Sequence, residues 1–303
     1  MVRISLIIAT YNRAEALIEA LRSVVQQRLP AQAWECVVVN NNSTDHTEEA
    51  FASFAECHPD LSLRMVREPK QGLSHARNRG IAEAQGDYIA IIDDDERINP
   101  DFLAAYVDLF DHHPEAYSAG GRVIATYEES SRPRWMSRFT ERPIANPMDF
   151  GDRVRPFPKG RIPAGGNMAF RREVFTQIGL FNPDLGRVGD RLIGGEESDL
   201  FARLSRAALP CYYQPRAVMW HLIPARKLTR SYFENLSRQI GVSQRLRAEQ
   251  AGTCGRLRLA ESLKWGATLL LATGYLCTLQ PSKALYLLRM RWQISRGVFG
   301  KIE

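Results

Sequence analysis

Three adjacent carboxylates, Asp93, Asp94 and Asp95, come directly after an apolar run at residues 88–92. Such a group at the end of a buried strand is costly unless a cation neutralises its charge. Carboxylate oxygens suit Mg²⁺ or Mn²⁺, and these ions often share their coordination with substrate phosphates. The sequence therefore predicts a site for a divalent metal or a phosphate group here. A solvated turn or a helix N-cap is the alternative interpretation.

A second acidic cluster lies at residues 194–200, where two glycines precede Glu196 and Glu197. If a helix begins at Glu196, Glu197 shares a face with the apolar residues three, four and seven positions later. Partial burial raises the pKa of a carboxylate toward the range of a general base, whereas a helix N-terminus lowers it. Glu197 is therefore the candidate base. Compensation of the helix dipole by both glutamates is the alternative.

Other side chains are candidates for the same chemistry. Arg77 lies in the segment 72–80, and its guanidinium offers several fixed donors to a diphosphate, although a solvated helix face also explains it. His221 ends an apolar run and is interpreted equally well as a structural histidine or a metal ligand. The aperiodic segment 130–158 places Trp135 among arginines, which predicts a loop that faces a glycan or a phosphate-bearing lipid acceptor.

The elements that must position these residues alternate between strand and helix patterns. Four apolar runs have the length of a strand: residues 2–9, 34–39, 61–66 and 88–92. This alternation predicts an α/β fold with a mainly parallel sheet flanked by helices. Ligands bind such sheets at the carboxyl ends of the strands. Polar clusters at residues 10–12, 40–45 and 93–95 follow three of the runs, so we expect them on one rim.

Six segments resemble, in the expected order, the motifs of the family 2 glycosyltransferases, which have the GT-A fold. The resemblance extends over about residues 2–225 and is more specific than a lone DxD motif. It covers the first strand with its donor loop, a second loop, an Ala-Arg-Asn segment, the metal motif, the segment before the acceptor site and the motif of the base: residues 7–13, 40–45, 72–80, 93–95, 165–171 and 195–197. This chain has Asn40 and Glu197 where the family usually has Asp.

The resemblance implies a metal-dependent, inverting glycosyltransferase that moves a hexosyl or related sugar from a nucleoside-diphosphate sugar to an acceptor hydroxyl. The expected setting is the synthesis of cell-surface polysaccharide or glycolipid, with a glycan or lipid-linked acceptor. Glu197 would be the catalytic base, and Asp95 would bind Mn²⁺ or Mg²⁺, with His221 as a second candidate ligand. The implied donor-binding residues are Thr10, Tyr11, Arg13, Asn40, Asn42, Arg77, Asp93 and Asp94. The implied acceptor-binding residues are Gly166, Asn167, Glu196 and Trp135.

Asn40 bears on the identity of the donor base, because the family's Asp at this position often recognises it. An Asn side chain can still accept from an imide N–H while also donating a hydrogen bond. We therefore favour a UDP-sugar, with GDP- and dTDP-sugars as alternatives.

Charge is distributed unevenly along the chain. Residues 226–303 contain 14 Lys and Arg against 4 Asp and Glu, whereas the preceding residues contain 26 against 30. We expect a catalytic domain at 1–225, with a nucleotide-sugar-binding half at 1–120 and an acceptor-binding half at 121–225. A basic amphipathic helical region at 226–303 would follow it.

The C-terminal region has the pattern of a segment that lies on a membrane surface. Residues 265–279 carry no charge but are fewer than the roughly 20 that a comfortable span needs. Beyond Pro281, one helical pattern combines an apolar face with a basic flank: Leu285, Leu288, Trp292 and Phe299 with Lys283, Arg289, Arg291 and Arg296. We therefore expect a cytoplasmic protein attached peripherally to anionic lipid at the cytoplasmic face of the membrane. Packing on the catalytic domain or on another subunit is the alternative.

Other classes of protein fit less well. The five cysteines are scattered without a CxxC pair, which disfavours a disulfide framework or a cysteine metal cage and fits a reducing cytosol. No GxGxxG follows the first strand, which disfavours a dinucleotide oxidoreductase, and we expect no nucleic-acid partner. A carboxylate-pair glycoside hydrolase and a membrane-associated binding protein with an inactive transferase-like domain are the rival hypotheses.

Overall fold

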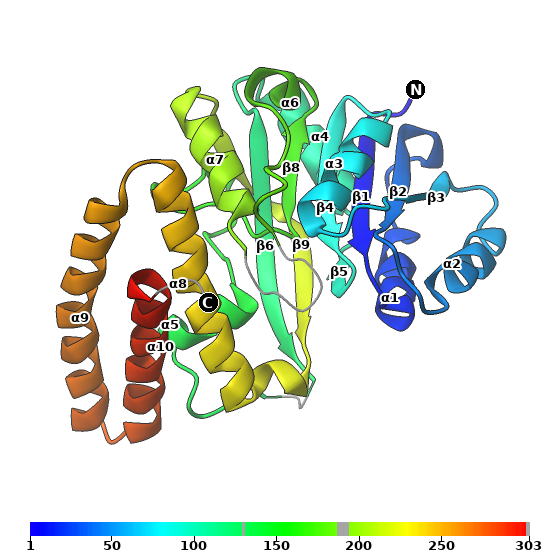
Figure 1. The fold of residues 1–303 in the computed structure, drawn as a ribbon. Coiled ribbons are helices and arrows are strands. Elements are labelled where there is room, and N and C mark those ends of the chain that lie inside the picture. The colour runs from blue at the N-terminus through cyan, green and yellow to red at the C-terminus, as the bar shows by residue number, and fades with distance from the viewer. Residues whose placement is uncertain (129–130, 187–193, 301–303) are drawn as a thin grey trace. The chain divides into compact units, whose positions relative to one another are not determined.

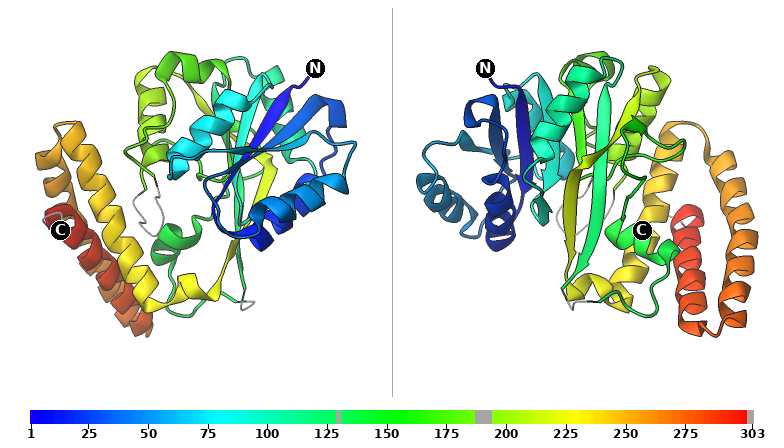
Figure 2. Two further views of the ribbon diagram at one scale, coloured as in Figure 1. Left: turned by 45° about the vertical axis from the view of Figure 1, so that its right-hand side comes forward. Right: turned by 180° about the vertical axis from the view of Figure 1, so that it is seen from behind.

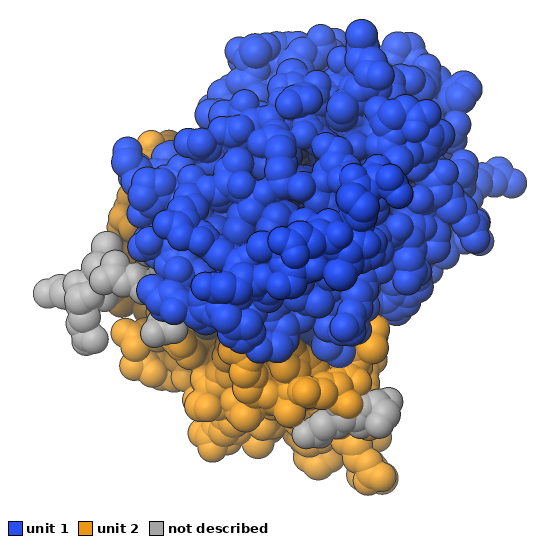
Figure 3. All heavy atoms as spheres, turned by 90° about the vertical axis from the view of Figure 1, so that its right-hand side faces the viewer, with its two compact units in different colours: residues 1–124, 148–189, 196–222 blue, residues 125–147, 190–195, 223–303 orange. Residues whose placement is uncertain are grey.

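The computed structural model describes residues 1–128, 131–186 and 194–300. They form two compact units, which Figure 3 shows in different colours. Unit 1 comprises the described residues within 1–124, 148–189 and 196–222, and unit 2 those within 125–147, 190–195 and 223–303. Separate hydrophobic clusters stabilise the two units.

The first part of unit 1 is a parallel half-sheet with its connecting helices. Its elements are β1 (Ile4–Thr10), α1 (Ala14–Val24), the short 3-10 helix η1 (Ala31–Ala33), β2 (Trp34–Asn40), α2 (Thr47–Glu56), β3 (Leu63–Arg67), α3 (Leu73–Glu83) and β4 (Tyr88–Asp93). The strands lie in the order β3-β2-β1-β4, and each neighbouring pair is parallel. All residues of β1 and β2 are buried, which accounts for their largely apolar sequences.

The later strands pair mainly antiparallel. The remaining elements of this part of the chain are β5 (Glu96–Ile98), α4 (Phe102–His112), β6 (Ser118–Tyr127), β7 (Arg155–Pro156), β8 (Met168–Arg171), α6 (Glu173–Ile178), α7 (Glu196–Arg206) and β9 (Cys211–Ile223). Within the described residues one nine-stranded sheet has the order β3-β2-β1-β4-β8-β6-β9-β5, with β7 beside β9 (Figure 1). β8 is antiparallel to both β4 and β6. The α/β prediction is confirmed, and the parallel part is its first four strands.

Side chains alternate along the strands, so each face of the half-sheet has its own hydrophobic layer. Leu6 of β1 belongs to one cluster with Leu17 of α1, and Ile7 belongs to another with Ala76 of α3. Helix α3 lies so close to β1 that a Cβ on Gly80 would overlap the side chain of Ile7. The placement of α1 and α3 on opposite faces can be followed in Figure 2.

Unit 2 is mainly helical. Its helices are α5 (Arg138–Ala145), the short 3-10 helix η2 (Ala225–Leu228), α8 (Arg230–Gln250), α9 (Cys254–Cys277) and α10 (Pro281–Phe299). Helices α8, α9 and α10 run side by side in Figures 1 and 2. A Cβ on Gly241 of α8 would overlap the carbonyl oxygen of Ile294 in α10, and one on Gly297 would overlap that of Arg238. Glycine therefore allows the backbones of α8 and α10 to touch at this crossing.

Residues 125–147 belong to unit 2, whereas the sequence placed them in the acceptor-binding half. Trp135 shows the physical reason. Its ring stacks on that of Tyr286 in α10, with 4.2 Å between the ring centroids, and lies 5.3 Å from the ring of Phe233 in α8. The functional division at residue 225 stays a prediction.

Helix α10 has the amphipathic character that its sequence predicts. Leu285, Trp292 and Phe299 are about half exposed. Arg291, however, was expected to flank a lipid-facing surface, and it instead bonds the buried Glu261, with its Nη1 3.0 Å from both carboxylate oxygens. The buried carboxylate draws this arginine into the helical packing, so Arg291 is not part of the exposed basic flank.

Helix α9 exposes a larger apolar surface than α10. Six leucines on α9 or just after it are more than half exposed: Leu259, Leu263, Leu269, Leu270, Leu276 and Leu279. Among the described residues, no helix combines the length and the apolar character that a membrane span requires.

Candidate active site

The carboxyl ends of the parallel strands bring the polar clusters together. Thr10 at the end of β1 pairs in register with Asn40 at the end of β2, and Ala9 pairs with Asp93 at the end of β4. The loops after β1 and β2 are also joined, because Asn12 Oδ1 accepts a hydrogen bond of 2.7 Å from the Thr44 N–H. The expected single rim is therefore present.

Asp94 is bound by two side chains of the first loop. Its Oδ2 accepts from the Thr10 hydroxyl at 2.9 Å, and its Oδ1 accepts from Arg13 Nη1 at 2.8 Å. Burial raises the pKa of Asp94 to about 6, although Arg13 opposes the shift. The same Arg13 nitrogen lies 3.2 Å from Asp95 Oδ2. Thr10 and Arg13, which the sequence assigns to the donor, thus hold the acidic motif in place.

Arg77 of α3 is the centre of a buried ionic network. Its Nη1 donates to Glu196 at 3.2 Å and to Glu197 at 3.0 Å, and its Nη2 donates to Asp93 Oδ1 at 3.0 Å. Nη2 also donates to the Gly165 carbonyl at 3.2 Å. The Arg77 side chain is only 1% exposed. One buried guanidinium therefore joins carboxylates from β4 and α7.

Glu196 and Glu197 form a coupled pair with opposite pKa shifts. Burial and the charge of Glu197 raise the pKa of Glu196 to about 8. Burial also raises the pKa of Glu197, but Arg77 and a hydrogen bond from Glu196 outweigh it and hold this pKa below its ordinary value. The side chain of Glu197 is 21% exposed, against 3% for Glu196. The proton of the pair is therefore favoured on Glu196, and Glu197 is the carboxylate that reaches the surface.

Glu96 is a further buried acid, and the sequence interpretation missed it. Its Oε2 accepts from the Asp93 N–H at 3.0 Å. Burial, followed by the charges of Asp93 and Asp95, raises the pKa of Glu96 well above its ordinary value. A Cβ on Gly166 would overlap this carboxylate, so the glycine makes room for Glu96. The sequence did contain a sign of this acid, because Glu96 directly follows Asp93, Asp94 and Asp95 as a fourth consecutive carboxylate.

Asn40 uses both ends of its side chain within the protein. Its Nδ2 donates to Glu48 Oε1 at 2.7 Å, and its Oδ1 accepts from the Ser43 N–H at 2.8 Å. Two neighbouring residues are exposed instead: Tyr11, and Asn42 with the left-handed φ of 69°. These two side chains, rather than Asn40, face the solvent at this end of the rim.

Asn167 is buried and Trp135 is partly exposed, and both have partners within the protein. Asn167 is fully buried; its Oδ1 accepts from the Tyr106 hydroxyl, and its Nδ2 donates to the carbonyls of Arg122 and Ala217 at 3.0 and 3.2 Å. Trp135 belongs to unit 2 and stacks on Tyr286. Packing and hydrogen bonding explain both residues, so direct acceptor contact does not follow from the structure.

Two partly exposed carboxylates have the donor chemistry that a hard divalent cation needs. The side chain of Asp93 is 35% exposed and that of Asp95 is 19% exposed. The other candidate ligand, His221 of β9, lies opposite Glu96 of β5 in the antiparallel register. In the described part of the chain, no group of three or more His, Cys, Asp or Glu side chains is arranged to hold a metal. Mg²⁺ sites typically use one or two carboxylates completed by phosphate and water, and this rim fits such a site.

A family model and curated relatives agree on the class of protein that this chain resembles. The model described as "Glycosyl transferase family 2" matches residues 5–179. The chain is 26% identical over 206 residues to glucosyl-dolichyl phosphate glucuronosyltransferase of Haloferax volcanii, which covers 67% of this chain and 63% of that protein. It is 27% identical over 248 residues to succinoglycan biosynthesis protein ExoM of Rhizobium meliloti, covering 80% and 75%. The chain thus spans less than two thirds of the Haloferax protein.

Solved structures show the same fold. Mannosyltransferase PcManGT from Pyrobaculum calidifontis, in complex with GDP-Man and Mn²⁺, matches with a TM-score of 0.63 and 21% identity, covering 99% of this chain and 88% of that one. TarS 1-349 of S. aureus with UDP-GlcNAc matches with a TM-score of 0.56 and 16% identity, covering 97% and 91%. The chain has a mixed α/β fold of the GT-A type with additional C-terminal helices.

Proposed function

This chain belongs to glycosyl transferase family 2, and from that premise we propose that it transfers one sugar from a nucleoside-diphosphate sugar to an acceptor hydroxyl with inversion at the anomeric carbon. The names of its relatives refer to a dolichyl phosphate-linked sugar and to succinoglycan biosynthesis. These names support an acceptor in the synthesis of cell-surface polysaccharide or glycolipid.

Glu197 is the catalytic base in this proposal, and the observation that carries it is the ionic network around Arg77. The network keeps Glu197 ionised and oriented, while part of its side chain remains exposed. The same guanidinium binds Asp93 at the end of β4. The proposed base is thereby fixed relative to the proposed donor site, which is the positioning that a single displacement requires.

In the proposed step, the acceptor oxygen forms a bond to the anomeric carbon as the bond from that carbon to the diphosphate oxygen breaks. The electron pair of the broken bond leaves with the diphosphate, and the acceptor proton passes to Glu197. The raised pKa of Glu196 favours its neutral form, which limits the negative charge beside Glu197 before the transfer.

Mn²⁺ or Mg²⁺ at Asp95, with His221 as a further candidate ligand, would neutralise the charge on the departing diphosphate. We assign Asp93 and the exposed Tyr11 and Asn42 to direct donor contacts. Thr10, Arg13 and Asp94 act by positioning the acidic motif, and Arg77 positions the carboxylates in place of the expected diphosphate contact. Thermal-shift screening of UDP, GDP and dTDP with and without Mn²⁺ identifies the nucleotide.

The test of the base compares Glu197→Gln with Asp199→Asn. Asp199 lies on the same helix and pairs with Arg203 at 2.9 Å, so its change alters charge without touching the Arg77 network. General base catalysis typically contributes about 10²–10⁴-fold in rate. We expect a loss of that size for Glu197→Gln and near-normal transfer for Asp199→Asn, measured as nucleoside diphosphate release that depends on acceptor. Normal transfer by a folded Glu197→Gln variant would rule out this base.

We also propose that the protein attaches peripherally to the cytoplasmic face of a membrane through unit 2. The exposed leucines of α9 and the half-exposed Trp292 and Phe299 of α10 form its apolar surface. The strongly basic composition of residues 226–303 suits anionic headgroups. Free cysteines in the described chain fit a reducing compartment.

Point substitutions test this attachment better than truncation, because residues 125–147 are packed in the same unit as the C-terminal helices. Leu263→Ser with Leu270→Ser removes the two most exposed leucines within α9, and Leu180→Ser changes an exposed leucine of unit 1 as the control. We expect sedimentation with anionic vesicles to fall for the α9 variant only. Equal sedimentation of both variants and the unaltered chain would contradict the proposal.

A further inference from the structure

The chain that leads into α7 is attached to α8. Gly194 and Gly195 belong to unit 2 together with α8. The next residue, Glu196, begins the helix that carries Glu197. The Gly194 N–H donates a hydrogen bond of 3.1 Å to the hydroxyl oxygen of Ser243 in α8. The chain is therefore bound to α8 three residues before the proposed base.

The Ser243 hydroxyl is oriented to accept this hydrogen bond. Its proton is donated to the Gln239 carbonyl at 2.8 Å, one turn earlier in the same helix. A hydroxyl has one proton and two lone pairs, so its oxygen meets Gly194 as an acceptor, which is what a backbone N–H requires. Ser243 is buried, so the hydroxyl is largely shielded from water. Loss of this oxygen would leave the Gly194 N–H without its acceptor.

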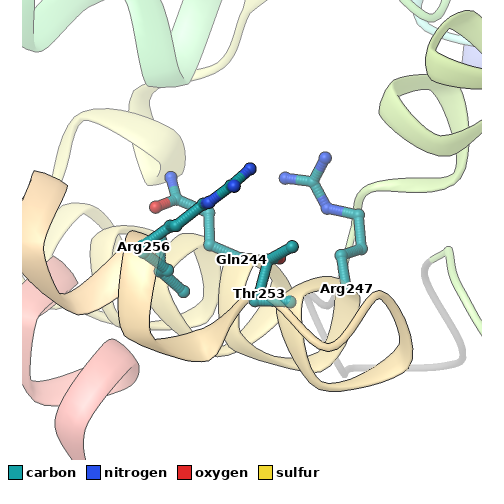
Figure 4. A pocket seen from close by; sticks show the side chains of 6 residues that line it. Gln244, Arg247, Thr253 and Arg256 are labelled. Carbon is teal, nitrogen blue, oxygen red and sulfur yellow. The ribbon is translucent and has the colours of Figure 1, made fainter.

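Gly195 lies beside the same face of α8. Arg247 is four residues after Ser243, and Figure 4 shows its side chain beside a hollow of unit 2. The Nε of Arg247 donates to the Ser243 carbonyl at 3.4 Å, and a Cβ on Gly195 would lie 3.1 Å from this nitrogen. Residues four apart share a helix face, so two consecutive residues of the chain lie beside one face of α8.

The two glycines make the start of α7 dependent on this attachment. Gly195 has a φ of 114°, in the left-handed region that favours glycine, and it turns the chain from α8 into α7. Neither Gly194 nor Gly195 has a side chain to cap the helix, and glycine has the greatest backbone freedom of any residue. Without a bond from outside, the pair would act as a hinge directly before the two glutamates. The Ser243 hydroxyl supplies such a bond.

The turn of α8 that binds Gly194 is itself held by α10. Gly241, two residues before Ser243, is so close to α10 that a Cβ would overlap the Ile294 carbonyl oxygen. Backbone contact of this kind restricts the movement of α8 against its neighbour. The acceptor for the Gly194 N–H is therefore part of a packed pair of helices.

We propose that Ser243 is a positioning residue for the transfer, because by holding Gly194 it fixes the start of α7 and so the direction in which Glu197 meets the acceptor. This inference rests on the proposed role of Glu197 as the base. It gives the C-terminal helices a part in the reaction that is separate from attachment to a membrane. A displacement of about 1 Å at a reacting group costs about 10²-fold in rate, so a bond near the start of α7 is sufficient to affect the chemistry.

The test compares Ser243→Ala with Ser237→Ala. Ser237 is also buried on α8 and donates to a carbonyl one turn earlier, that of Phe233 at 2.8 Å, so its change removes the same kind of bond away from Gly194. Transfer is measured as nucleoside diphosphate release that depends on acceptor. We expect kcat to fall about tenfold for Ser243→Ala and to stay within about twofold for Ser237→Ala. Ser243→Thr keeps the hydroxyl and should restore transfer.

A double-variant cycle with Glu197→Gln separates positioning of the base from a general loss of structure. If Ser243 acts through Glu197, Ser243→Ala should lower the residual transfer of the Glu197→Gln chain by less than about twofold. A structural defect would instead lower transfer about tenfold in both backgrounds, and that result would overturn the proposal. Equal kcat for Ser243→Ala and Ser237→Ala would overturn it as well.

Amide exchange keeps the failure of this proposal distinct from the failure of the proposed base. Hydrogen exchange at Gly194, followed by NMR, should be faster in Ser243→Ala than in Ser237→Ala, whichever residue is the base. Faster exchange with unchanged kcat would show that the bond exists without positioning the base, and equal exchange would exclude the bond; either result overturns the proposal. Normal transfer by Glu197→Gln would instead remove the base itself, and this inference would fall with it.

Circular dichroism verifies the fold of each variant. Should Ser243→Ala not fold, Ser243→Cys takes its place, because a thiol fills the position with a much weaker acceptor than the hydroxyl. The same fall in kcat and the same faster exchange at Gly194 are expected. Normal values of both in a folded Ser243→Cys variant would contradict the positioning role.

Discussion

Replacement of Arg77 by Met should destabilise unit 1 strongly. The two terminal nitrogens of Arg77 donate hydrogen bonds of 3.0–3.2 Å to Asp93, Glu196 and Glu197, in a position that is almost fully buried. Met retains an unbranched apolar side chain but leaves these carboxylates without their shared cation. Removing one partner of a buried ionic group typically costs about 3–5 kcal/mol. We expect a loss of that size in the free energy of unfolding.

Arg79→Met is the matched control for this experiment. Arg79 lies two residues further along α3 and pairs with Glu83 at 2.8 Å, with 42% of its side chain exposed. Exposed pairs contribute about 0–1 kcal/mol, so this variant should unfold almost like the unaltered chain. Urea denaturation followed by circular dichroism measures both changes at neutral pH. Equal losses for Arg77→Met and Arg79→Met would refute the stabilising role of the network.

The same replacement should change the pH dependence of transfer. Arg77 is the main group that holds the pKa of Glu197 below its ordinary value, so its loss raises that pKa. The base is active when ionised, and the acid limb of kcat/KM should therefore move to higher pH. Arg77→Lys keeps a positive charge but loses the branched guanidinium that reaches both Asp93 and Glu197. The acid limb of its kcat/KM profile should therefore lie between those of the unaltered chain and of Arg77→Met. An unchanged acid limb in a folded Arg77→Met variant would contradict the assignment of the base.

Three further predictions concern the buried acid, the metal and the helix crossing. The pKa of Glu196 is raised from 4.5 to about 8, so the stability it contributes is present below its ordinary pKa and is lost as the pH rises through about 8. Glu196→Gln should remove this loss, seen as a urea midpoint that falls less between about pH 5 and 9 than in the unaltered chain. Asp95→Ala should abolish the extra thermal stabilisation that Mn²⁺ gives in the presence of the preferred nucleoside diphosphate, and retention of that effect would exclude Asp95 as a ligand. Gly241→Ala should cost about 1–3 kcal/mol because its Cβ would overlap the backbone of Ile294, whereas Gly255→Ala, with open space around it, should not destabilise the protein. Equal urea midpoints for these two glycine variants would show that the crossing tolerates a side chain.

The rim of the sheet was predictable because it depends on local sequence patterns. Continuous apolar runs identify strands that are buried on both faces, and the polar residues that follow them mark the carboxyl ends. The register between β1, β2 and β4 then brings Thr10, Asn40 and Asp93 together. The start of α7 was predicted for the same reason, since Glu196 begins a helix after two glycines.

The roles of Arg77 and Asn167 were not predictable in this way, because their partners are distant in sequence. Arg77 meets carboxylates 16 to 120 residues away, and Asn167 bonds Tyr106 from 61 residues away. Arg77 shares a face of α3 with Gly80 and Ile81, which was a sign that it is buried. Arginine side chains are mostly exposed in proteins, however, so the sequence also allowed a solvated position. The association of residues 125–147 with α8 and α10 likewise depends on the rings of Trp135 and its partners.

The anomeric configuration of the first product tests the central claim most directly. The protein is incubated with an α-linked nucleoside-diphosphate sugar, Mn²⁺ and the acceptor, and the anomeric proton of the product is read by NMR before any secondary reaction. Direct displacement assisted by Glu197 predicts a β-linked product. An α-linked product would contradict both the single displacement and the role given to Glu197.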